Sequence, residues 1–129
     1  MIPGRAGNGA TMVVMVPGSV TATATATRLK PCCSLYHRAV ELVGKRWTGA
    51  IVLVLIEEGP LRFSEIKQAV PELSDRLLSE RMKELESEGM VERHVIDDTP
   101  VRVEYALTDK GRALEPAIRA LKSWANDWL

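Results

Sequence analysis

The sequence has little of what secreted scaffolds and membrane proteins require. Two cysteines, Cys32 and Cys33, are too few for a disulfide framework, and a bond between these neighbours would close a strained ring. The longest apolar runs, at 12–16 and 50–56, fall far short of the roughly 20 residues of a membrane-spanning helix. The first five residues lack the basic and apolar regions of a secretory signal. We therefore expect a cytoplasmic protein with reduced thiols and no membrane partner.

The sequence also lacks an excess of charge of either sign, because 17 Lys and Arg side chains balance 17 Asp and Glu side chains. This balance excludes a globally basic nucleic-acid-binding protein, so any DNA binding must depend on where the charges lie. Enzyme motifs are missing as well: no phosphate-binding glycine loop precedes a helix, and there is no nucleophile elbow. The two histidines, His37 and His94, are distant in sequence. We expect no enzyme activity, no cofactor and no metal site.

A length of 129 residues suits one domain. Residues 1–29 differ from the rest, since they contain four of the nine glycines and an alternating Thr-Ala run over 20–27. Alanine is too small to build the core face of a strand, so we interpret this segment as a disordered low-complexity tail. Met12 and Met15 are alternative starts, which leaves open whether the tail is translated. Residues 30–129 are expected to form the domain.

Apolar periodicity and capping residues, such as Ser74 at the start of one helix and Gly89 just past its end, predict the order of the elements. The predicted helices cover 34–43, 63–70 and 74–88, a β-hairpin covers 91–107, and a long helix runs from Thr108 to the C-terminus. The segment 47–58 stays open between a buried strand, which its Ile and Val content favours, and a buried helix, which its length allows. The fold class is mainly α with a small β-hairpin wing.

Two short helices separated by Pro71, Glu72 and Leu73, with a hairpin after them, predict a winged helix-turn-helix. The second helix of such a motif can enter the major groove of double-stranded DNA. If its apolar stripe of Leu78, Met82 and Leu85 is buried, the helical rotation of about 100° per residue places a set of polar side chains on the opposite face. These side chains are Arg76, Ser79, Glu80 and Lys83.

The candidate DNA contacts come from this helix and from the wing. Ser74 and the amide groups beside it suit a phosphate, and Arg76 lies in the first turn, where base edges are usually read. The complete set is Ser74, Arg76, Ser79, Lys83, Arg93, His94 and Arg102. Four glutamates on the same helix, and Asp97 and Asp98 at the hairpin tip, favour the alternative of a solvated surface. The glutamates are Glu80, Glu84, Glu86 and Glu88. A winged-helix module that binds proteins without DNA is the alternative function.

Several stretches, taken in order, resemble the HxlR-type winged helix-turn-helix transcriptional regulators. They are Cys33–Trp47, Arg62–Ile66, Leu73–Met82, Glu84–Val91 and Pro100–Gly111. The resemblance implies a homodimeric regulator of transcription that binds DNA, often at its own promoter or that of a neighbouring gene. It also implies that the run 50–56 is a central buried helix. The family pattern often has a proline after its N-terminal cysteine, whereas Ser34 follows Cys33 here.

The terminal helices are expected to form the dimer interface. The C-terminal helix carries an apolar stripe larger than one small core can cover, and we assign Leu121, Trp124 and Trp128 to a partner subunit. The second contribution to this interface is expected from the first helix, through Leu35 and Ala39. Leu114 and Ile118, by contrast, are expected to pack on their own domain.

Cys33 and His37 are four residues apart and share one helix face. A nearby imidazolium favours the thiolate, so Cys33 is a candidate sensor. The resemblance implies that its effector would be a small oxidant or electrophile. The alternative is that Cys33 is a small buried apolar side chain.

Overall fold

The computed structural model describes residues 29–31 and 33–129, so Cys32 and almost all of the expected tail lie outside the described residues. The chain divides into two compact units, residues 1–37 and 38–129. Of the first unit, the structure describes a short segment and the first turn of α3 (Ser34–Val43). The helix-turn-helix and the wing belong entirely to the second unit.

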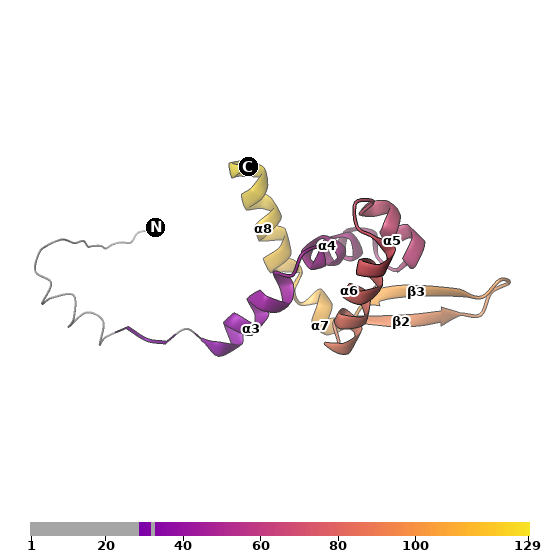
Figure 1. The fold of residues 1–129 in the computed structure, drawn as a ribbon, viewed down its shortest axis with the longest axis horizontal. Coiled ribbons are helices and arrows are strands. Elements are labelled where there is room, and N and C mark those ends of the chain that lie inside the picture. The colour runs from indigo at the N-terminus through magenta and orange to yellow at the C-terminus, as the bar shows by residue number, and fades with distance from the viewer. Residues whose placement is uncertain (1–28, 32) are drawn as a thin grey trace, which may run out of the picture. The chain divides into compact units, whose positions relative to one another are not determined.

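The second unit contains the remaining elements (Figure 1). After α3 come α4 (Thr48–Glu58), β1 (Leu61–Arg62), α5 (Phe63–Ala69), α6 (Asp75–Ser87), β2 (Val91–Ile96), β3 (Arg102–Leu107), α7 (Asp109–Arg112) and α8 (Glu115–Trp128). The fold is mainly helical with a small antiparallel sheet, which confirms the predicted fold class. The hairpin of β2 and β3 extends past the helices as a narrow arm (Figure 1).

The segment 47–58, left open by its sequence, is helical from Thr48 onward. Ile51, Val52 and Leu55 are fully buried, while the apolar residues between them are partly buried against the same core. A helix that is covered on nearly all sides needs no polar face. Because this segment has no polar stripe, the periodicity of its apolar residues could not distinguish a helix from a strand.

One core joins the helix-turn-helix to the wing and to α8. Its members come from α4, α5, α6, β2, β3, α8 and the connections between them: Ile51, Val52, Leu55, Ile66, Val70, Leu73, Leu78, Met82, Leu85, Met90, Val91, Leu107 and Ile118. The predicted stripe of α6, Leu78, Met82 and Leu85, is at most 2% exposed. Burial of this stripe fixes which face of α6 points outward.

The turn between α5 and α6 is closed by a side chain. Lys67, in the last turn of α5, donates from Nζ to the carbonyl oxygen of Pro71 at 3.0 Å and also to that of Leu73. The Leu73 amide donates to the carbonyl oxygen of Val70 at 3.1 Å. Pro71 and Leu73 lie beyond the end of α5, so Lys67 satisfies carbonyl groups of the turn itself. The two helices are thus held by a short connection that the Lys67 side chain closes.

Both ends of α6 follow the predicted capping chemistry. Ser74 Oγ accepts from the Leu77 amide at 3.1 Å, which makes Ser74 the N-cap. At the other end, Gly89 has φ of 73°, and the amides of Gly89 and Met90 donate to the carbonyl oxygens of Glu86 and Leu85. This pair of bonds is a Schellman motif, which glycine favours because it accommodates a positive φ.

The sheet has the order β1-β3-β2, and both pairings are antiparallel. The hairpin register places Val91 opposite Leu107 and Ile96 opposite Arg102. The third strand, β1, was not predicted, because its two residues, Leu61 and Arg62, are too few to show a period. It anchors the base of the wing beside the start of α5.

The prediction of one long helix from Thr108 was wrong. Thr108 does cap a helix, since its Oγ1 accepts from the Gly111 amide at 3.1 Å, but that helix, α7, ends at Arg112. A second helix, α8, begins at Glu115 with Pro116 in its first turn. Proline has no amide hydrogen and its ring collides with the carbonyl group four residues earlier, so the helix is interrupted there. No helix among the described residues is long and apolar enough to cross a membrane.

Candidate nucleic-acid interface

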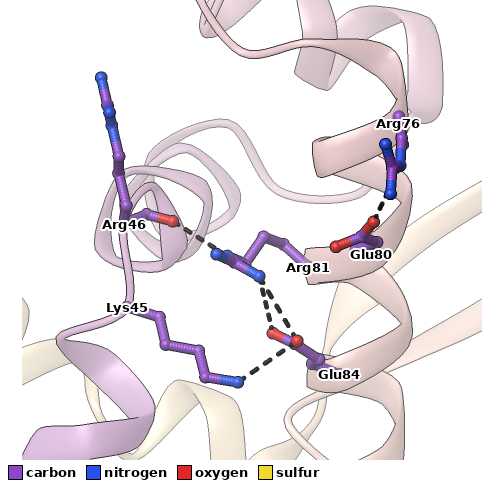
Figure 2. A network of polar contacts seen from close by, with 6 residues as sticks. All are labelled: Lys45, Arg46, Arg76, Glu80, Arg81 and Glu84. Carbon is purple, nitrogen blue, oxygen red and sulfur yellow. Dashed lines mark hydrogen bonds and ion pairs between the residues drawn. The ribbon is translucent and has the colours of Figure 1, made fainter.

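The outward face of α6 begins with Arg76, whose side chain is 90% exposed. Its Nε lies 3.3 Å from Glu80 Oε2, one turn further along the helix (Figure 2). Glu80 is itself exposed, with 49% of its side chain accessible. The first outward position on this helix is therefore an arginine that pairs with an acidic neighbour.

Two further predicted contacts lie along α6. Lys83 is exposed and makes no ion pair within the part of the chain that the structure describes. Ser79 is half-buried, because it lies at the edge of the outward face, closer to the core stripe. Arg76 and Lys83 are therefore the cations that this face offers to solvent.

The three predicted DNA contacts of the wing lie on two different faces of the hairpin. Side chains alternate along a strand, so His94 in β2 and Arg102 in β3 share one face of the hairpin while Arg93 lies on the other. His94 Nε2 is 3.5 Å from Glu92 Oε1. Arg102 is held more firmly, at 3.2 Å from Asp98 Oδ2 and 3.4 Å from Glu104 Oε2. Arg93, which is exposed, has no such partner among the described residues.

A polar network along one side of α6 ties this helix to the loop between α3 and α4 (Figure 2). Arg81 is its centre and is only 15% exposed. Its Nε donates to the carbonyl oxygen of Arg46 at 3.0 Å, and its Nη1 lies 3.3 Å from Glu84 Oε1. Glu84 also pairs with Lys45, at 3.3 Å. The network thus links one side of α6 to residues 45 and 46.

The loop that Arg81 holds has an unusual backbone. Trp47 has φ of 76° and is, within the described ranges, the one residue other than glycine with a positive φ. The left-handed conformation costs a non-glycine residue about 1–2 kcal/mol. The Arg46 guanidinium lies 5.3 Å from the Trp47 ring centroid, in the geometry of a cation–π contact. Contacts from α6 and from the loop itself therefore hold this conformation.

The candidate sensor residues lie at the start of α3. The His37 amide donates to the carbonyl oxygen of Cys33 at 3.0 Å, so Cys33 immediately precedes the helix and His37 lies one turn into it. Cys33 is exposed in this chain. The alternative prediction of a buried apolar cysteine does not hold for the single chain.

Apolar side chains are exposed on both helices assigned to a dimer interface. On α8, Leu121, Trp124 and Trp128 are 60%, 52% and 74% exposed. On α3, Leu35 is 68% exposed and Ala39 is exposed as well. Ile118 is buried and Leu114 half-buried in their own domain, as expected. The apolar stripe of α8 thus continues beyond the core of the single chain.

Sequence reasoning missed the residues that position the interface. Glu84 was counted among the acidic residues of a solvated face and Arg81 was assigned no role, whereas Arg81 is anchored to a carbonyl group 35 residues away in sequence. Lys67 gave a weak signal, as a cation in the last turn of a helix. Among the residues that the structure describes, no group of three metal-ligating side chains is present.

A helix-turn-helix followed by an antiparallel hairpin defines the winged helix-turn-helix class of proteins. Residues 42–129 match the HxlR-like helix-turn-helix family, and the chain belongs to that family. A relative in Bacillus subtilis, the uncharacterized HTH-type transcriptional regulator YvaP, is 53% identical over 97 residues, which are 75% of this chain and 89% of YvaP. The protein is therefore a transcriptional regulator of the HxlR type.

Solved structures resemble the chain in fold and in sequence. The reduced form of the transcriptional regulator YodB from B. subtilis is 44% identical, with a TM-score of 0.68, and the match covers 76% of this chain and 95% of YodB. The redox regulator HypR in its reduced form is 34% identical, with a TM-score of 0.68 over 73% of this chain and 92% of HypR. YodB has also been solved after diamide treatment and bound to quinone, and HypR in its oxidized form.

Proposed function

We propose that residues 30–129 form a homodimer that binds double-stranded DNA, with α6 in the major groove and the hairpin of β2 and β3 as the wing. One observation carries this proposal: α6 buries Leu78, Met82 and Leu85 and turns Arg76 and Lys83 to solvent. The second helix of a helix-turn-helix reads base edges from such a face. Membership in a family of transcriptional regulators supports the same assignment.

Each candidate residue has a role that follows from its chemistry. Arg76 reads a base edge, since a guanidinium can bond to two acceptors of guanine at once. Ser74 and the first amides of α6 receive a phosphate, and Ser79 and Lys83 contact the groove wall. Arg93, on one side of the wing, and His94 and Arg102, on the other, contact the flanking backbone. Since Arg102 is paired with two carboxylates, we expect the smallest contribution from it.

The test is DNA binding by the purified full-length protein as salt is raised. Lysines and arginines that neutralise phosphates release counterions, so the logarithm of affinity should fall linearly with the logarithm of salt concentration. Arg76→Ala should lose about 1–3 kcal/mol of discrimination at one base position. Lys83→Ala should instead weaken binding to all sequences. If the protein binds no DNA at low salt, the proposal is contradicted. The alternative function, a winged-helix module that binds proteins, would then remain.

We further propose that a small oxidant or electrophile controls DNA binding through Cys33. The supporting observations are the exposure of Cys33 at the start of α3 and the likeness to regulators solved in reduced, diamide-treated and quinone-bound forms. With diamide, two thiols of a dimer give up two electrons and two protons, a disulfide forms, and the diamide becomes a hydrazine. With a quinone, the thiolate adds to a ring carbon and a carbon–sulfur bond forms. The proton displaced from that carbon moves to one ring oxygen and a proton from water reaches the other, so the ring becomes a substituted hydroquinone.

The thiol proposal is tested by substituting each cysteine in turn. Wild-type protein should change its DNA affinity on treatment with diamide or benzoquinone, and Cys33→Ser should not. Cys32→Ser is the matched control, because it removes the neighbouring thiol and leaves Cys33. Suppose that Cys33→Ser binds DNA with normal affinity before treatment and responds to diamide or benzoquinone like wild type. The proposal that Cys33 controls DNA binding is then wrong, and the DNA-binding proposal is unaffected.

A further inference from the structure

An acidic side chain occupies the face of α6 that would meet DNA. Glu80 lies one turn after Arg76, is about half exposed, and carries a charge that phosphates repel. Glu84, one turn further along the helix, is by contrast already bound by Arg81 and Lys45. An exposed ion pair within one helix contributes little to folding, so stability does not account for Glu80 at this position.

The atoms that Glu80 contacts suggest its role. Glu80 Oε2 is 3.3 Å from Nε of Arg76, the nitrogen nearest the main chain (Figure 2). This contact leaves the terminal nitrogens Nη1 and Nη2 for a second partner. Guanine offers two acceptors, O6 and N7, in the major groove, and two guanidinium N–H groups match them in a bidentate pair. An arginine held at Nε can therefore present its terminal fork to a guanine without being reoriented.

We infer that Glu80 is a positioning residue that holds Arg76 for the recognition of one guanine in each half of the DNA site. This inference rests on the proposed DNA binding by α6. Orienting Arg76 before binding reduces the side-chain entropy that is lost in the complex. The carboxylate has a second effect, because it repels the phosphates of any DNA. Only a site with a guanine that engages Arg76 offsets this repulsion. Glu80 thus raises the ratio of specific to non-specific binding.

The experiment begins by selecting sites from randomised double-stranded oligonucleotides with the wild-type protein. Affinities are then measured for the selected site with each of the four bases at each position. We expect Arg76→Ala to lose the preference for guanine at one position per half-site. Glu80→Ala should lower the preference at that same position by about two- to fivefold. Its binding to unrelated DNA should rise by about two- to threefold.

Two controls separate this role from a general effect of charge or folding. Glu86→Ala removes the same charge from the same exposed helix, away from Arg76, and should leave the guanine preference unchanged. In an Arg76→Ala background, Glu80→Ala should no longer affect base preference, because its effect passes through Arg76. Thermal unfolding of each variant verifies that it is folded.

The possible failures are distinguishable. If the wild-type protein selects no sequence, the proposed DNA binding fails and this inference fails with it. If it selects a site but Glu80→Ala keeps the full guanine preference, the inference alone is overturned. The inference is overturned equally if the effect of Glu80→Ala persists without Arg76, or if the position read by Arg76 prefers a base other than guanine.

Discussion

At Gly111 the backbone of α7 lies against the carbonyl group of Met90, just beyond the end of α6. A Cβ atom at this position would lie 2.2 Å from the carbonyl oxygen of Met90 and 3.0 Å from Cδ2 of Leu107. Thr108 fastens the same junction, since its Oγ1 donates to the carbonyl oxygen of Gly89 at 2.5 Å. A side chain at Gly111 would therefore push apart the capped end of α6 and the start of α7.

We predict that Gly111→Ala destabilises the protein by about 1–3 kcal/mol, the usual cost of overpacking a tight contact. The matched control is Gly49→Ala in α4, where the nearest atom to the new Cβ is 4.0 Å away. Alanine is favoured over glycine in a helix by up to about 1 kcal/mol, so this control should be neutral or stabilising. Thermal or urea unfolding measures both. Equal destabilisation by the two substitutions would show that the close approach at Gly111 is not the cause.

At the scale of elements, the angle of α6 depends on contacts at its back as well as on its buried stripe. Arg81 reaches the carbonyl oxygen of Arg46 and pairs with Glu84, while Trp47 keeps a left-handed backbone beside them. An unfavourable backbone conformation persists only where its surroundings hold it. The loop after α3 and α6 are thus bound to each other.

We predict that Arg81→Ala lowers stability by about 1–3 kcal/mol, because a mostly buried charged donor and its bond to Arg46 are lost. It should also weaken DNA binding, since α6 loses a contact that orients it. Arg76→Ala, on the same helix and 90% exposed, is the comparison: it should impair base recognition with stability changed by no more than about 0.5 kcal/mol. Urea unfolding and DNA titration together distinguish the two. An Arg81→Ala variant as stable as wild type would contradict this prediction.

A second link between elements responds to pH. Lys122 Nζ in α8 donates to Glu57 Oε2 in α4 at 2.6 Å. This bond from Lys122 is the main reason that the pKa of Glu57 lies below its usual value of 4.5. A carboxyl group with a lowered pKa stabilises the fold above its unfolded pKa, and the effect is lost as the pH falls through its folded value.

We therefore predict that Glu57→Gln lowers the Tm at pH 7, and that the difference from wild type shrinks as the pH falls below 4.5 and is lost in stronger acid, once Glu57 is protonated in the folded protein. Because the pair is at the surface, high salt should also reduce the difference. Glu58→Gln, an exposed neighbour, is the control and should show a smaller difference at neutral pH. A Tm difference that stays constant from pH 7 to pH 3 would mean that the ion pair is not responsible.

The elements that sequence analysis predicted correctly are those with local signals. Ser74, Thr108 and Gly89 marked helix ends because capping uses residues within a few positions of the boundary. The helix α4 stayed undecided, because a segment buried on nearly all sides has no period, and the break before Pro116 was overlooked. The strand β1 forms only because β3 pairs with it.

In the candidate interface, too, the features with a local sequence signal were predicted and those that depend on distant residues were not. The exposure of Arg76 and Lys83 followed from the rotation of a helix whose apolar stripe was recognised. The anchoring of Arg81 was unpredictable, since its acceptor is a backbone carbonyl 35 residues away and any residue could supply it. The two faces of the wing became visible only once the register of Arg93 and His94 was known.

At the scale of the whole molecule, the proposed dimer connects the apolar stripe of α8 to DNA recognition. Aromatic side chains bury about 150–250 Å² each and dominate interface energetics, so two exposed tryptophans form a substantial anchor. Two recognition helices related by a two-fold axis would read half-sites about 34 Å apart. A monomer would read one half-site and lose the affinity gained from the second.

We predict that replacing both Trp124 and Trp128 by alanine converts a dimer into a monomer, because these side chains, 52% and 74% exposed in the single chain, would lose their contacts with the partner. Light scattering during size-exclusion chromatography measures the mass. The variant should bind a full two-fold site little better than a half-site, whereas wild type should prefer the full site strongly. Asn126→Ala changes an exposed residue on another face of α8 and should remain dimeric. A monomeric wild-type protein, or a double variant that keeps both its mass and its preference, would place the interface elsewhere.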